Sequence, residues 1–219
     1  MVPVRRRTAV LISGRGSNMA SLIAACASPG YPAEIALVVS NRPEAAGLGH
    51  AAAAGVPTSV IDHRAFATKA EFEARLDATL HEARIELVCL AGFMRLLSAA
   101  FVEAWRDRLL NIHPALLPAF PGLHTHERAL AAGVAEHGAS VHVVRAETDS
   151  GPIVVQGAAP VLPGDTPESL AARVLGVEHR LYPLALDLVA RGVARIEGER
   201  VVVSAETKAA NPDLIWPAG

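Results

Sequence analysis

Three polar side chains whose types suit acyl-group chemistry lie in the second half of the chain. Asn111 and His113 are two residues apart in the apolar run LLNIH, so in an extended strand they point to the same side. An asparagine supplies a neutral amide donor, and a histidine can donate a proton or carry positive charge near neutral pH. This pairing is typical of groups that stabilise an oxyanion. Asp149, in the run Asp-Ser-Gly-Pro, is either an ordinary turn residue or a carboxylate held beside that imidazole.

A glycine-flanked run, GRGSN at residues 14–18, follows a short apolar stretch and precedes a helical pattern. Glycines let the backbone approach an anion closely, and a helix N-terminus offers free N–H groups. Met19 stands where the dinucleotide fingerprint has its third glycine, and no Gly-Lys-Ser/Thr follows. The run is therefore either a plain strand-to-helix turn or a monophosphate site, and we favour the phosphate site.

Other histidines and apolar residues admit both structural and functional interpretations. His124-x-His126, with His113 and Asp149, forms only a weak metal-ligand pattern, and we expect no metal. His142, in the strand-like run SVHVV, is either a core residue or a support for the catalytic side chains, and we favour the second. For residues 92–97 (GFMRLL) core packing is the default interpretation, but their position after the end of a strand fits a pocket wall for a flat apolar ligand.

The order of elements predicts an α/β protein with a doubly wound, mostly parallel sheet and helices on both faces. The apolar runs without alternation predict buried strands at residues 8–13, 34–40, 56–61, 87–91, 109–112, 139–144 and 152–156. Periodic patterns predict helices through Cys26 and over residues 45–54, 69–84 and 167–190. The residues Phe72, Leu76, Thr79 and Leu80 should share one helix face.

The C-terminal region predicts a hairpin over residues 194–196 and 200–204, followed by a loose tail from Asn211 to Gly219. We expect a single domain over residues 1–219. Its N-terminal half, about 1–105, would bind phosphate, and its C-terminal half, about 106–205, would carry the catalytic residues, with a tail over 206–219.

Composition excludes several classes of protein. The 219 residues are 51% hydrophobic and 19% charged, which excludes a disordered chain. The net charge of −2 and the 4% aromatic content argue against a nucleic-acid partner. No apolar stretch approaches the ~18 residues of a membrane span. Cys26 and Cys89 lack ligand spacing, and the short run after the basic start is no signal peptide, so we expect a reduced, cytoplasmic protein.

Taken in order, the runs SGRGSN, LAGFMRLLS, LLNIHPALLPAFPGLHTHERAL, GASVHVV, DSGPIVVQ and EHRLYP resemble the glycinamide ribonucleotide formyltransferase family of purine biosynthesis. The resemblance extends from about Thr8 to Val203. It implies a Rossmann-like formyltransferase fold with a C-terminal hairpin. It also implies direct attack of the amine of glycinamide ribonucleotide on the formyl carbon of 10-formyltetrahydrofolate, without a metal.

The resemblance assigns roles to residues at matching positions. Asn111, His113 and Asp149 match the catalytic trio, with His142 behind them. The residues matching the ribonucleotide site are Gly16, Ser17, Asn18 and Glu178. Those matching the folate site are Lys69, Met94, Arg95, Leu96, Leu97 and Asn111. We further expect the adjacent carboxylate to raise the pKa of His113, so that the imidazolium is available at pH 7.

Two departures from the family pattern are Ala115, where serine is frequent, and Ser150, where glycine is frequent after the aspartate. Because Ser150 directly follows Asp149, the resemblance supports the position of the Asp149 carboxylate less strongly than that of the other matching residues. The alternatives are a formyltetrahydrofolate hydrolase, methionyl-tRNA formyltransferase and a non-catalytic nucleotide-binding module. The first two carry an additional domain for which we expect no room here, and the third has no need of the trio. A monomer and a homodimer are both compatible with the sequence.

Overall fold

The computed structural model describes residues 5–217, which form two compact units with the boundary between Leu110 and Asn111. Strand β5 (Leu109–His113) runs across this boundary, so that its first two residues belong to one unit and Asn111 and His113 to the other. The glycine-flanked run therefore lies in the first unit, and all three candidate catalytic residues lie in the second.

A parallel sheet forms the centre of the first unit. Strand β1 (Arg6–Ile12) pairs with β2 (Ala33–Ser40) on one side and with β4 (Leu87–Leu90) on the other, and β2 pairs with β3 (Thr58–Val60). All three pairings are parallel, and β4 is buried along its whole length. The sequence predicted these four strands, because runs that are apolar at successive positions suit a sheet covered on both faces.

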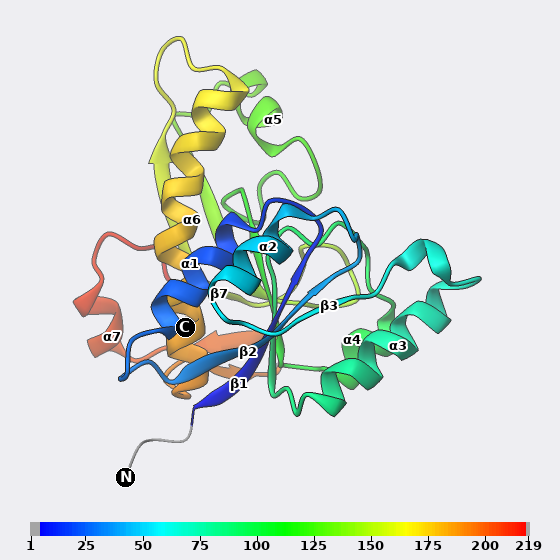
Figure 1. The fold of residues 1–219 in the computed structure, drawn as a ribbon. Helices are drawn as coiled ribbons and strands as arrows, with labels where there is room; N and C mark the ends of the chain where they lie inside the picture. Colours follow the sequence, from blue (N-terminus) through cyan, green and yellow to red (C-terminus); the bar gives the residue numbers. More distant parts are fainter. Residues whose placement is uncertain (1–4, 218–219) are drawn as a thin grey trace. The chain divides into compact units, whose positions relative to one another are not determined.

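Helices connect and cover these strands (Figure 1). They are α1 (Ser17–Cys26), α2 (Ala46–Ala53), α3 (Lys69–Glu82) and α4 (Ala99–Ala104), with a 3-10 turn over His63–Ala65. Both views show α3 beside α4, away from α2. Trp105 at the end of α4 donates a hydrogen bond to Asp77 of α3 over 2.7 Å. The predicted apolar face of α3 is buried, whereas α4 is too short for the helical period to reveal it.

The second unit combines one long helix with an antiparallel strand pair. Strands β6 (Glu136–Val143) and β7 (Ile153–Pro160) pair in antiparallel register, unlike the three strand pairs described for the first unit. Helix α6 (Pro167–Ala190) packs on both strands and keeps its predicted bounds. Thr166 and Ser169 cap its N-terminus reciprocally, which satisfies backbone donors left free by the first turn. A short helix, α5 (Thr125–Ala131), was not predicted.

The C-terminal region contains the predicted hairpin, with β8 (Arg195–Glu197) paired to β9 (Arg200–Val202). Helix α7 (Ala205–Ala210) follows. The prediction of a loose tail is wrong for the described residues, because Ile215 forms an antiparallel bridge with Gln156 of β7. Ala218 and Gly219 lie outside the described residues.

Both cysteines are buried and free, in agreement with the absence of a disulfide framework. Burial raises the pKa of the Cys26 thiol to about 12. Within residues 5–217, none of the helices has the length and hydropathy needed to cross a bilayer.

Candidate active site

The glycine-flanked turn opens helix α1 without a side-chain cap. Gly16 occupies the N-cap position in the left-handed conformation, with φ of 75°, and as a glycine it provides no side-chain cap for the first turn. Ser17 and Asn18 begin the helix, and Asn18 is buried. The turn therefore presents helix N–H groups to a small anion, and the helix dipole favours negative charge there.

Close packing explains the glycine at position 16 of this turn and its neighbour Gly47. A Cβ atom on Gly16 would lie 3.0 Å from the Cα of Gly47 in α2, and one on Gly47 would lie 2.6 Å from the Cδ1 of Ile12. Gly47 also donates its N–H to the carbonyl of Gly14 over 3.1 Å. The start of α2 thus holds the turn against the end of β1.

Ser13 connects this turn to the segment interpreted as a pocket wall. Its hydroxyl accepts the N–H of Met94 over 2.8 Å and donates to Oδ1 of Asn41 over 2.5 Å. Asn41 in turn contacts Nδ1 of His63 through its amide nitrogen over 3.1 Å. The sequence analysis missed these roles, although Ser13 and Asn41 both directly follow buried strands, where polar side chains reach ligand sites.

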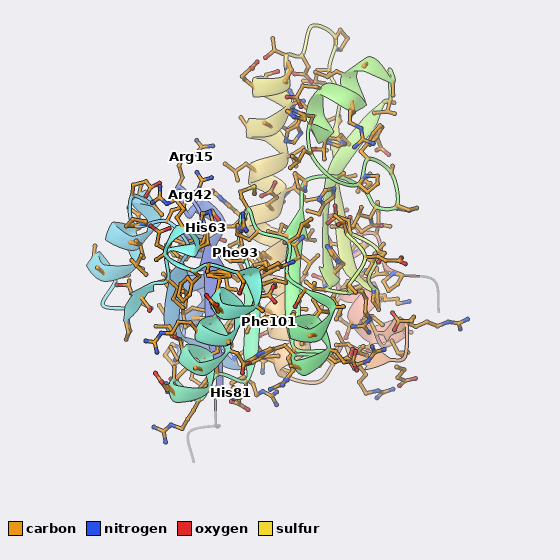
Figure 2. The ribbon with its side chains drawn as sticks, turned by 90° about the vertical axis from the view of Figure 1, so that its right-hand side faces the viewer. Arg15, Arg42, His63, His81, Phe93 and Phe101 are labelled. Atoms are coloured by element: carbon orange, nitrogen blue, oxygen red, sulfur yellow. The ribbon has the colours of Figure 1, made fainter. Side chains whose placement is uncertain are left out.

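The segment around Met94 is exposed and apolar. Met94 is 60% and Leu96 is 71% exposed, and Arg95 is exposed between them. Exposed large apolar side chains next to one another mark a binding surface more often than a packing one. Figure 2 shows Arg15, Arg42 and His63 toward one end of this unit, whereas Phe101 and His81 lie toward the other.

Lys69 at the start of α3 is engaged with its own helix. Its Nζ lies 3.8 Å from Oε1 of Glu73, one turn further on. The carboxylate of Glu73 is buried and accepts the N–H of Ser98 over 2.7 Å. Lys69 must therefore share its charge between Glu73 and any anionic ligand.

In the second unit, His113 lies between two oxygen acceptors. Its Nε2 is 3.0 Å from the carbonyl oxygen of Phe120, and its Nδ1 is 3.4 Å from Oδ2 of Asp149. A carbonyl oxygen can only accept, so Nε2 carries a proton. The nitrogen that gains and loses a proton is therefore Nδ1, beside the carboxylate.

Asp149 is held in place by its backbone conformation and by a backbone donor. Its φ of 54° is left-handed, and Gly122 donates its N–H to Oδ2 over 2.8 Å. Burial alone would raise the pKa of Asp149, but the hydrogen bonds from His142 and the Gly122 N–H, together with the positive charge that His113 carries when it is protonated, outweigh burial and lower it. The carboxylate is consequently ionised at neutral pH.

His142 links Asn111 to the same carboxylate. Its Nδ1 donates to the carbonyl of Val143 over 3.1 Å, and its Nε2 lies 3.1 Å from the amide nitrogen of Asn111. Nε2 lies 3.6 Å from Oδ1 of Asp149. The amide N–H of Asn111 that His142 does not use remains available as a donor. The structure thus brings Asn111, His113, His142 and Asp149 together.

The expected pKa of His113 was wrong in direction. Burial, which disfavours the charged imidazolium, lowers the pKa of His113. The Phe120 carbonyl and the charge of Asp149 act in the opposite direction, but they do not compensate. His113, 5% exposed, is therefore neutral in the resting protein at pH 7.

The remaining predicted residues have separate surroundings. Glu178 is buried on α6. His124 lies 3.5 Å from Glu127, and the ring of His126 packs edge-on against His137 with 5.2 Å between centroids. The functional groups that sequence reasoning missed here are the Phe120 carbonyl and the Gly122 N–H. Backbone groups leave no signal in a sequence beyond the proline- and glycine-rich loop that carries them.

His137 is expected to make the fold sensitive to acid. It is 1% exposed, and burial together with the neighbouring His126 lowers its pKa to about 4. In the unfolded chain the imidazole has a pKa of about 6.5, so the unfolded state takes up a proton at a higher pH than the folded state does. The free energy of unfolding is therefore highest above about pH 6.5 and falls by up to about 3 kcal/mol as the pH drops toward 4. Urea unfolding between pH 7.5 and 4 measures this slope.

The variant His137→Leu should flatten the slope, whereas substitution of the exposed His50 by glutamine should leave it unchanged. An equal slope in the parent and in His137→Leu would contradict the assignment.

Comparison with known protein families gives a match over most of the chain. The family described as formyl transferase matches residues 6–186. The chain is 42% identical over 199 residues to phosphoribosylglycinamide formyltransferase of Escherichia coli, covering 88% of this chain and 94% of that protein. It is 49% identical over 197 residues to the trifunctional purine biosynthetic protein adenosine-3 of Drosophila melanogaster, covering 89% of this chain but only 15% of that protein.

Solved structures agree with the sequence comparison. Glycinamide ribonucleotide transformylase 1 from Symbiobacterium toebii superposes with a TM-score of 0.88 at 45% identity, covering 91% of this chain and 94% of that one. Formyltetrahydrofolate deformylase from Burkholderia mallei superposes with a TM-score of 0.83 at 30% identity, covering 92% of this chain and 70% of that one.

Proposed function

The chain belongs to the formyl transferase family and has its Rossmann-like fold, and from this premise we propose that it formylates glycinamide ribonucleotide in cytoplasmic purine biosynthesis, with 10-formyltetrahydrofolate as the donor. The products are formylglycinamide ribonucleotide and tetrahydrofolate. One observation carries the proposal: Nδ1 of His113 lies 3.4 Å from an ionised carboxylate while Nε2 is occupied by a carbonyl. The relatives with this named activity support the choice of acceptor.

The acceptor binds through its phosphate to the turn at Gly16, Ser17 and Asn18. The uncapped start of α1 supports this assignment, since its N–H groups suit a phosphate and no acidic residue stands in its first turn. Glu178 then contacts the ribonucleotide.

The donor binds through its pterin to Met94, Arg95, Leu96 and Leu97. The exposed apolar side chains of this segment favour a flat heterocycle, and its backbone groups provide hydrogen bonds. Lys69 contacts the anionic end of the folate, in competition with Glu73.

Transfer proceeds by direct attack. The amine nitrogen forms a bond to the formyl carbon, and the carbonyl π electrons move to oxygen, giving a tetrahedral oxyanion. The free N–H of Asn111 donates to this oxyanion. Collapse re-forms the carbonyl and breaks the bond to N10 of the folate.

His113 carries the proton between the two nitrogens. Because its resting imidazole is neutral, Nδ1 accepts a proton from the amine nitrogen once that nitrogen has bonded to the formyl carbon and become positively charged, and the resulting imidazolium is stabilised by Asp149. Nδ1 then gives the proton to N10 as that nitrogen leaves. We propose that no metal takes part, because the amide and the imidazolium supply the required charge stabilisation.

A transfer assay tests this function. Purified protein is mixed with 10-formyltetrahydrofolate, and tetrahydrofolate formation is followed by absorbance with and without glycinamide ribonucleotide. We expect product only when the acceptor is present. Equal formation of tetrahydrofolate without the acceptor would identify a hydrolase. No formation of tetrahydrofolate, with or without the acceptor, would indicate a non-catalytic binding module.

Ser17→Asp is expected to separate the two ligands. The added carboxylate repels a phosphate, so the KM for glycinamide ribonucleotide should rise at least about tenfold while the KM for the formyl folate stays within about twofold. Ser17→Ala is the matched control, since it changes the side chain without adding charge. Equal increases in both KM values for Ser17→Asp would contradict the phosphate assignment.

A further inference from the structure

A buried glutamine on β7 holds the loop that follows His113. Gln156 is 8% exposed, and its Nε2 donates to the carbonyl of Leu117 over 2.8 Å and to Oγ of Ser140 over 2.7 Å. Both acceptors are buried, so each bond is made away from competing water.

Ser140 of β6 completes the connection. Its hydroxyl donates to the carbonyl of Ala115 over 2.6 Å and accepts the N–H of Leu117 over 3.0 Å. The side chains of Gln156 and Ser140 together bind three backbone groups of Ala115 and Leu117, within four residues of His113. A loop held at three buried points has little freedom to shift.

The same loop supplies both backbone groups that orient the catalytic pair. The carbonyl of Phe120 holds Nε2 of His113, and the N–H of Gly122 holds the carboxylate of Asp149. Displacement of the loop would therefore change the ring orientation of His113 and the position of Asp149 together.

We propose that Gln156 is a positioning residue for formyl transfer, which aligns His113 and Asp149 through the loop at residues 114–122. The catalytic role of His113 rests on the proposed function, whereas the alignment is a property of the fold. Gln156 does not touch the reacting groups; it determines where the Phe120 carbonyl and the Gly122 N–H lie.

The C-terminal segment supports Gln156 from its other side. The backbone N–H of Gln156 donates to the carbonyl of Ile215, and the N–H of Ile215 donates to the carbonyl of Gln156, both over 2.9 Å. These two bonds fix the main chain at Gln156, from which the side chain reaches the loop. The segment after α7 therefore also helps to hold the glutamine in place.

The test replaces Gln156 by methionine, which keeps the length of the side chain and removes both donated bonds. Small misplacement of catalytic groups can cost about 10²-fold in rate, so we expect kcat to fall by about 10- to 100-fold. The KM for glycinamide ribonucleotide should stay within about twofold. Leu186→Val, which trims another fully buried side chain of this unit, should keep the parent kcat.

A second readout follows the imidazole itself and requires no activity. In the parent, long-range 1H–15N correlation should show neutral His113 protonated at Nε2. Gln156→Met should show a mixture of the two tautomers, because the Phe120 carbonyl is no longer held. Leu186→Val should give the parent spectrum.

The outcomes separate this inference from the proposed function. An altered tautomer ratio in Gln156→Met supports the positioning role even if the parent fails to formylate glycinamide ribonucleotide. If Gln156→Met has the same kcat and the same His113 tautomer as the parent, the positioning role is overturned. If that variant does not fold, Gln156→Glu, which has nearly the same shape but at most one donor, takes its place under the same criteria.

Discussion

Replacing His113 by alanine is expected to lower kcat by about 10²- to 10⁴-fold, the usual contribution of a general acid–base group. The loss should fall on kcat more than on either KM, because the proton moves only after both substrates are bound. Steady-state kinetics with each substrate varied in turn measures this. The fold should persist, since the ring makes two side-chain contacts and its removal leaves the strand hydrogen bonds of β5 intact.

The double variant shows whether His113 and Asp149 act as one unit. Asp149→Asn removes the charge that raises the pKa of His113, so that pKa should fall further and turnover should drop. His113→Ala combined with Asp149→Asn should then be scarcely slower than His113→Ala alone. Multiplicative losses would show that the two residues act independently, and the proton-transfer mechanism would have to be abandoned.

Asn111→Ala is expected to lower kcat by about 10²- to 10³-fold, the usual cost of losing one oxyanion donor. The KM for the acceptor should change little, because the phosphate turn belongs to the other unit. The amide nitrogen of Asn111 also lies 3.1 Å from Nε2 of His142, so the substitution removes that contact. A loss of less than about threefold in kcat would remove Asn111 from the mechanism.

Asn111→Asp is the matched variant for this prediction. It has the same size but places a carboxylate where the oxyanion forms, so kcat should fall further than in Asn111→Ala. An activity above that of Asn111→Ala would indicate that the side chain acts through shape and not through its donated hydrogen bond.

Local patterns in the sequence determined the elements of this protein. The buried face of α3 at Phe72 and Leu76, the bounds of α6 and the four parallel strands of the first unit were all predicted. Helical period, capping and strand apolarity depend on residues a few positions apart, so they can be read from one sequence. The short helices α4 and α5 were not predicted, because one or two turns are too short to show the helical period of apolar residues.

The chemistry of the site depended on groups that sequence order separates. Asn111 and His113 could be paired by alternation along one strand, and the family resemblance added Asp149. Their contacts with the Phe120 carbonyl, the Gly122 N–H and His142 appear only after β5, β6 and the two loops have come together.

Only the tertiary structure decided the charge of His113 and the role of Gln156. A neighbouring carboxylate predicts a raised pKa for His113, but burial lowers it. Burial results from the packing of segments that are far apart in the sequence, so no local pattern predicts it. Likewise, Leu117 and Gln156 are 39 positions apart in the sequence, and no local pattern predicts the hydrogen bond between them. That bond exists because β7 folds back antiparallel on β6 and brings the glutamine to the loop after His113.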